Sequence, residues 1–422
     1  MNSTKNHTLI SISLILIVYI VFLSLFGFRK QVPLRLEDEF PIFSRPYNAS
    51  SIKSAFVGPW IPAGLKDTIR NYYRPFSIVA YAWLYDLCGH NTSELYLVRM
   101  LFSLIKFAAF FGVLFLLTNR SLFTAFSATL LYTISFKIFD EQVVFQCLPD
   151  IIVATTFFTA LFLYILLSSR QFGLLQTTGL VAGIILIYTI GLGTKENAFF
   201  LVPTLLFYRL IYSYSHWKGP FQRTIRVIFE RKQLILFSAL SVISIVYFIA
   251  RYHSLGTQYI ISNSYRTGNN ALRVAMLNII NNFALIPITY LDHPFALNDL
   301  IEIGKCLSNL ALPSFAIYLL FRKDVHIELK KGILFSLVLI LLNTSFYTQL
   351  VRARFNSIGN LGSIYIVIGI AHIIYSFRNK AKYPYNLLVS SITIACLSIY
   401  TIQNTTNILN RQHPTQVVLR NR

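Results

Sequence analysis

The sequence is short of charged residues, and acidic ones above all. Asp, Glu, Lys and Arg together make up 13% of the chain and only 16 residues are acidic, whereas 55% are hydrophobic. With a mean hydropathy of +0.59, the chain has too little polar surface to solvate a water-soluble fold. This excludes a soluble globular enzyme and predicts an all-α, polytopic integral membrane protein.

The usual spacings of metal, disulfide and nucleotide sites are also missing. The four cysteines form no CxxC pair and the eight histidines form no HxxxH pair. No GxGxxG or GxxxxGK loop is present, which disfavours a nucleotide-sugar donor. Although 37 residues are basic, no basic soluble domain carries them, so we expect membrane lipids and no nucleic acid as partners. No cofactor is predicted with certainty, and a divalent metal held by acidic residues stays open.

Long apolar runs predict about eleven transmembrane helices in one membrane domain, residues 1–422, because about 20 apolar residues cross the hydrocarbon core. The first run is too long for a cleaved signal peptide and is expected to be a retained anchor. The predicted spans are 9–26, 95–117, 122–139, 149–167, 174–192, 198–212, 234–250, 307–321, 332–350, 358–377 and 387–402.

Basic residues gather in alternate connections, which predicts a cytoplasmic N-terminus. Two external loops then follow, 29–94 and 252–305, and a polar tail at 403–422. Residues 73–88 are apolar but open with Arg74 and contain Asp86, so they are expected to form an interfacial helix in the first loop. That loop is unusually basic for the external side, as a loop that binds a lipid phosphate would be.

Two candidate groups lie in the first external loop. One carboxylate of the acidic run Glu37, Asp38 and Glu39 can serve as a general base, the alternative being a solvated loop cluster. Arg74, at the head of the interfacial helix, can fork onto a phosphate or reach lipid headgroups.

Further candidates follow the later spans on the same side. Asp140, Glu141 and Asp150 form a second acidic cluster suited to an acceptor or a metal, and carboxylates so near hydrocarbon are functional candidates. Lys195 with Glu196 ends the fifth span, either as a phosphate site or as a local ion pair. Arg352 and Arg354 lie where the charge rule would not place them, which favours phosphate binding over interfacial anchoring.

Four of these motifs occur in the order seen in the multispanning GT-C glycosyltransferases, a group that includes protein O-mannosyltransferases, oligosaccharyltransferase catalytic subunits and aminoarabinose transferases of lipid A. Asp38-Glu39-Phe40, Tyr73-Arg74-Pro75, Asp140-Glu141 through Asp150, and Lys195-Glu196 resemble their motifs, over residues 1–212. No tetratricopeptide domain or WWDYG-like motif is present, so the acceptor stays open.

The resemblance implies a GT-C fold and inverting sugar transfer from a polyprenyl-phosphate donor (undecaprenyl or dolichyl phosphate) to a glycan, lipid or protein acceptor on the periplasmic or lumenal side. It makes Asp38 the catalytic base with Glu39 beside it. The donor-phosphate ligands would be Arg74, Lys195, Arg352 and Arg354.

The compact chain looks most like a bacterial inner-membrane enzyme that modifies lipopolysaccharide O-antigen, with the ER membrane as the alternative. Three other functions remain open. They are a lipid-linked sugar flippase or transporter, an O-antigen polymerase or ligase, and a structural membrane subunit.

Overall fold

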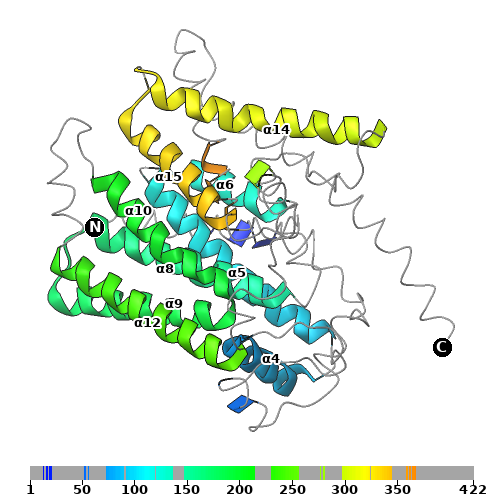
Figure 1. Ribbon diagram of the computed structural model, residues 1–422, viewed down its shortest axis with the longest axis vertical. Helices are drawn as coiled ribbons and strands as arrows, with labels where there is room; N and C mark the ends of the chain where they lie inside the picture. The colour runs from blue at the N-terminus through cyan, green and yellow to red at the C-terminus, as the bar shows by residue number, and fades with distance from the viewer. Residues whose placement is uncertain are drawn as a thin grey trace.

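The computed structural model describes residues 73–89, 92–118, 120–135, 147–213, 230–255, 297–323 and 325–344, apart from some side chains, among them most of those in 297–309. It also describes scattered positions within 13–20, 52–56, 276–280 and 358–366. All regular structure within these ranges is helical, which confirms the all-α class. The elements, labelled in Figure 1, are α4 (Pro75–Cys88), α5 (Thr92–Leu117), α6 (Leu122–Ile134), α8 (Leu148–Ser169), α9 (Leu174–Thr194), η3 (Glu196–Phe200), α10 (Leu201–Ser213), α12 (Arg231–Leu255), α14 (Leu297–Phe321) and α15 (Ile327–Thr344).

Four helical segments in the described part of the chain are long and apolar enough to cross a membrane. They are Leu97–Leu117, Leu148–Ser169, Leu174–Thr194 and Arg231–Leu255. Each coincides with a predicted span, and the protein is an integral membrane protein. The count of eleven remains a prediction, because the spans expected at 9–26, 358–377 and 387–402 lie wholly or mostly outside the described residues.

Several helix ends differ from the hydropathy pattern. The helix predicted at 122–139 ends at Ile134, where Ser135 takes an extended backbone. The span predicted at 198–212 is divided into the 3-10 turn η3 and the helix α10. Both α14 and α15 begin before the predicted residues 307 and 332, so residues 297–305 of the expected second loop are helical. Hydropathy locates the apolar part of a helix and misses the polar turns that extend it.

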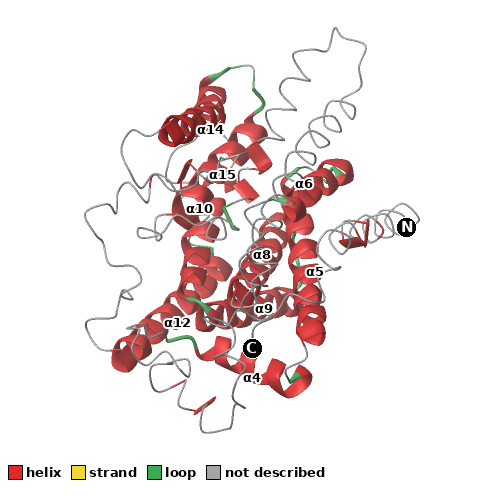
Figure 2. Ribbon diagram, turned by 90° about the vertical axis from the view of Figure 1, so that its right-hand side faces the viewer, coloured by secondary structure: helices red, strands yellow, loops and turns green. Residues whose placement is uncertain are grey.

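Helix α8 lies at the centre of the described bundle. It packs against α5 on one side and α9 on the other, and α12 in turn packs against α9 (Figures 1 and 2). In the apolar stretch of α8, 67% of residues are buried, against 17% in α9. Helix α9 therefore gives most of its surface to lipid, while α8 is enclosed by protein.

Aromatic rings fill the core between α5, α6 and α8. The Phe110 and Tyr132 rings stack with their centroids 4.2 Å apart, and the Phe158 ring meets Phe110 edge-on at 5.3 Å. Such pairs add specific geometry to the burial of apolar area. They fix α8 against its neighbours, and with it the first turn of α8, which carries Asp150.

Glycines bring the last turn of α9 close to α4 and α8. A methyl group added at Gly193 would overlap the Phe76 ring of α4, and one added at Gly191 would lie 2.6 Å from the Thr156 hydroxyl of α8. Close backbone approach of this kind is what small residues allow in membrane proteins. In the same contact, the Ser77 hydroxyl donates to the Thr194 carbonyl at 2.6 Å. These glycines thus bring the end of α9 beside the start of α4.

We predict that Gly193→Ala separates α4 from α9 and lowers the free energy of unfolding by about 1–3 kcal/mol, the usual cost of overpacking. The thermal unfolding midpoint of the detergent-purified protein measures this effect. Gly179→Ala is the matched control, since it lies in the same helix with no atom within 4 Å of the added methyl. Equal midpoints for the two variants would contradict the prediction.

Candidate active site

Arg74 and Glu196 form a forked ion pair between segments 122 residues apart. Arg74 immediately precedes α4, whose first residue, Pro75, suits a helix start. Its Nε donates to Glu196 Oε2 at 3.0 Å and its Nη2 donates to Oε1 at 2.8 Å. The Glu196 side chain is only 1% exposed, so this carboxylate is neutralised by protein and not by water.

A break in the helix sends Lys195 and Glu196 to different partners. Helix α9 ends at Thr194, Lys195 has an extended backbone (φ −159°, ψ 138°), and η3 begins at Glu196. Neighbouring side chains of an extended backbone point to opposite sides. Lys195 pairs with Asp150 in the first turn of α8, whereas Glu196 pairs with Arg74.

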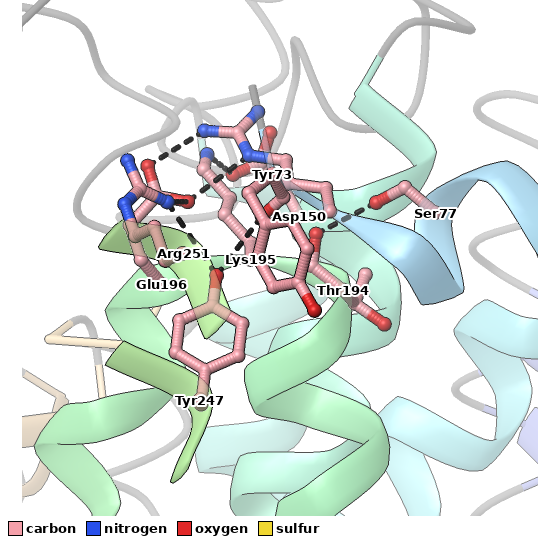
Figure 3. A network of polar contacts seen from close by, with 9 residues as sticks. Tyr73, Ser77, Asp150, Thr194, Lys195, Glu196, Tyr247 and Arg251 are labelled. Atoms are coloured by element: carbon pink, nitrogen blue, oxygen red, sulfur yellow. Dashed lines mark hydrogen bonds and ion pairs between the residues drawn. The ribbon is translucent and has the colours of Figure 1, made fainter. Parts of the chain in front are cut away.

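Arg251 is a second guanidinium on the Glu196 carboxylate. Its Nη1 lies 3.5 Å from Glu196 Oε2 and 3.5 Å from the Tyr247 hydroxyl, one helical turn earlier on α12. Tyr247 in turn donates to the Tyr73 carbonyl at 3.0 Å. Figure 3 shows these side chains meeting from the start of α4, the junction of α9 with η3, and the last turns of α12.

The two guanidiniums set the charge of Glu196. Burial by itself would raise the pKa of this carboxyl, but Arg74 and then Arg251 more than offset it, and the pKa lies well below its usual range. Glu196 is therefore ionised at neutral pH. The site is a water-poor cluster of paired charges, in which electrostatic interactions are far less screened than on a surface.

The structure brings together four of the residues singled out in the sequence. Figure 3 shows Asp150, Lys195 and Glu196 in one polar network, and Arg74 belongs to it through its ion pair with Glu196. The other candidates lie outside the described residues: Asp38, Glu39, Asp140, Glu141, Arg352 and Arg354. Their roles stay predictions.

Sequence reasoning missed Arg251 and Tyr247. Arg251 directly follows the span predicted at 234–250 and was not singled out, although α12 continues to Leu255. The sequence does contain a signal. Tyr247 and Arg251 are spaced i and i+4 at the end of an apolar run, and this spacing places both on one face of a helix.

Two further cations were not anticipated inside the span of α5. Arg99 and Lys106 are 1% and 0% exposed. The Lys106 ammonium lies 5.3 Å from the ring centroid of Phe107 and 5.4 Å from that of Tyr132, within cation–π range. Ionisable residues within a membrane span are functional candidates by default.

No group of three or more His, Cys, Asp or Glu side chains within the described ranges is arranged to hold a metal ion. Of the acids suggested for a metal, Asp150 belongs to these ranges, and there it pairs with Lys195. Asp140 and Glu141 lie outside them.

Comparison with known proteins gives a result at the level of structure. No family model and no curated protein matches the sequence. The fold is similar to the archaeal oligosaccharyltransferase AglB from Archaeoglobus fulgidus in complex with an inhibitory peptide and a dolichol-phosphate. The TM-score is 0.52 at 10% identity, over 93% of this chain and 56% of that one. The chain has the GT-C fold.

Two more structures of the Archaeoglobus fulgidus oligosaccharyltransferase agree with this GT-C assignment. The apo form gives a TM-score of 0.51 at 11% identity, over 93% of this chain and 56% of that one. The form tethered to an acceptor peptide containing the NVT sequon gives 0.51 at 12%, over 93% and 55%. The chain spans a little over half the length of these proteins, and at such identities the likeness shows the fold alone.

We predict that Glu196→Gln destabilises the GT-C bundle by about 3–5 kcal/mol, because it leaves two guanidiniums without their shared carboxylate. Thermal or denaturant unfolding in detergent measures the change. Glu230→Gln is the matched control. Its carboxylate pairs with Arg209 at 3.1 Å but is 41% exposed, so about 0–1 kcal/mol is expected.

The pH dependence of this difference has a defined sign. A carboxyl whose pKa is depressed on folding stabilises the protein above its unfolded pKa, about 4.3 for Glu, and loses that contribution as the pH falls towards the folded pKa. The gap between wild type and Glu196→Gln should stay constant from neutral pH to about pH 5 and shrink below it. A gap that closes between pH 7 and 6 would show that Glu196 is not held ionised.

Proposed function

We propose that this protein is an integral-membrane glycosyltransferase that moves a sugar from a polyprenyl-phosphate donor to an acceptor on the external side of the membrane. One observation carries the proposal: a GT-C fold gathers three cations at one end of its helices, the buried Lys195 and Arg251 and the partly buried Arg74. A phosphate attached to a membrane-embedded carrier is an anion that such a site is suited to bind.

The geometry of Arg74 supports a role at the leaving group. Its guanidinium is fixed in place by two parallel bonds to a planar carboxylate, and its positive charge acts on a phosphate placed beside it. Cations fixed in a water-poor site stabilise charge that develops on the leaving phosphate. We propose that further cations contribute to this stabilisation of the leaving phosphate. They are Lys195, which precedes Glu196 in the chain, and Arg352 and Arg354, which lie outside the described residues.

The proposed reaction is a single inverting displacement. An acceptor hydroxyl or amine attacks the anomeric carbon, the bond from that carbon to the phosphate oxygen breaks, and its electron pair leaves with the phosphate. Asp38, with Glu39 beside it, takes the acceptor's proton as general base. Asp150, with Asp140 and Glu141, is proposed to face the acceptor or a divalent metal.

The cellular setting is proposed by analogy with bacterial enzymes of this kind. Eleven spans with a cytoplasmic N-terminus would place the site on the periplasmic face of a bacterial inner membrane. The carrier there is undecaprenyl phosphate and the acceptor a surface glycan such as lipopolysaccharide O-antigen. AglB, the similar structure, was solved with a dolichol-phosphate and an inhibitory peptide, so a protein acceptor is the alternative.

A lipid-linked sugar flippase is the second candidate, and one observation favours it. Arg99 and Lys106 lie two turns apart on α5, buried within a membrane span. Cations spaced along a span are what a path for a phosphate headgroup across the membrane requires. A transport assay separates this function from sugar transfer.

We predict that purified wild type transfers radiolabelled sugar from polyprenyl-phosphate donors and that Asp38→Asn loses about a hundredfold or more, as loss of a general base costs. Arg74→Ala should also lose transfer. Asp86→Asn is the control, because Asp86 lies exposed on α4 in the same predicted loop. Matched unfolding midpoints establish that each variant is folded.

Two results would contradict this proposal in different ways. Normal transfer by Asp38→Asn would show that the base lies elsewhere. Absence of transfer with every donor and acceptor, together with movement of carrier lipid across the vesicle membrane, would favour the flippase.

A further inference from the structure

We propose that Arg251 is a direct ligand of the carrier phosphate, which it binds through the edge of its guanidinium formed by Nε and Nη2. The inference rests on the proposed function and names a residue of that site. Arg251 lies near the end of α12, is 1% exposed and was not among the residues singled out in the sequence.

The contacts of Arg251 leave this edge unused. Both of its polar contacts, to Glu196 Oε2 and to the Tyr247 hydroxyl, are made by Nη1, and both are long at 3.5 Å. Its Nε is buried and has no hydrogen-bond partner among the described residues. A buried donor without an acceptor costs free energy, which an acceptor that arrives with a ligand would recover.

Arg74 shows what this edge of a guanidinium binds at the same carboxylate. Its Nε and Nη2 together hold the two oxygens of Glu196 at 3.0 and 2.8 Å. In Arg251 the corresponding pair of donors is not engaged by Glu196. Two oxygens of a phosphate have the spacing to occupy it, as carboxylate oxygens occupy the edge of Arg74.

The charges of the cluster favour an added anion. Lys195 is matched by Asp150, whereas one carboxylate, Glu196, faces two guanidiniums. The carboxylate of Glu196 thus lies between two positive charges. The phosphodiester that links a sugar to a polyprenyl chain is also an anion, which guanidiniums at this position would attract.

Tyr247 fixes how Arg251 is presented. The tyrosine hydroxyl donates to the Tyr73 carbonyl, so its lone pairs face Arg251 Nη1. The rings of Tyr73 and Tyr247 pack with their centroids 5.6 Å apart, which holds the Tyr247 hydroxyl in place. A guanidinium anchored by one nitrogen keeps its other edge in a constant direction. Because the side chain is buried, the donor reaches that edge only after a local opening of the site.

If Arg251 only stabilised the fold, it would make the same contacts to Glu196, so the test must measure ligand binding. The probe is undecaprenyl monophosphate, which carries no sugar, added to the full-length protein in nanodiscs. Its Kd is measured by titration for wild type, Arg251→Gln and Arg251→Lys. Arg209→Gln is the matched control, since Arg209 is a mostly buried arginine paired with Glu230, at the opposite end of α12 from Arg251.

We expect Arg251→Gln to raise the Kd about ten- to hundredfold, the effect of losing a charge-assisted bond. Arg251→Lys, which keeps the charge and loses the fork, should fall between Arg251→Gln and wild type. Arg209→Gln should bind like wild type. A folded Arg251→Gln with an unchanged Kd overturns the inference. If Arg251→Gln does not fold, an unchanged Kd in Arg251→Lys overturns it instead, as does failure of wild type to bind.

The inference and the proposed function fail separately. Binding that depends on Arg251, without sugar transfer to any acceptor, would support the ligand role and reject the glycosyltransferase. Sugar transfer whose donor KM and kcat are both unchanged in Arg251→Gln would do the reverse.

Discussion

The buried carboxylate of Glu196 is the constraint on which the described site depends. A lone carboxylate in apolar surroundings is too costly to persist ionised, and here two arginines neutralise it. One arginine precedes α4 and the other lies near the end of α12, so the need to compensate a single charge joins segments remote in sequence. The same need excludes water from the cations, which is the condition under which they act most strongly on a phosphate.

The break at Lys195 makes this arrangement possible. A continuous helix would have carried Lys195 and Glu196 round one surface, about 100° apart. The extended residue instead directs the lysine to α8 and the glutamate to α4 and α12. One interruption in an apolar helix thereby serves three neighbouring elements. The close approach at Gly191 and Gly193 holds that interruption in register with α4 and α8.

The sequence predicted the apolar helices well and the polar network only in part. The spans of α8 and α9 were placed to within about two residues, because burial in lipid needs an unbroken apolar run. Lys195, Glu196 and Asp150 were recognisable as charges at the ends of such runs. Their pairing was not, since it depends on one backbone torsion at Lys195 and on the tertiary approach of α4. Arg251 was missed because a hydropathy profile ends an apolar span at an arginine and carries no information about the groups that the arginine contacts.

The length of α9 has a consequence of its own. The helix runs from Gly173 to Thr194, and one side of it packs against α8 and α12 while 17% of its apolar stretch is buried. One residue inserted along it would advance the end by about 1.5 Å and rotate it by about 100°. Lys195 and Glu196 would then face the wrong neighbours, although no contact of theirs had been altered directly. The length of α9 therefore determines where Lys195 and Glu196 lie, and the number of its residues matters to the site as much as their identity.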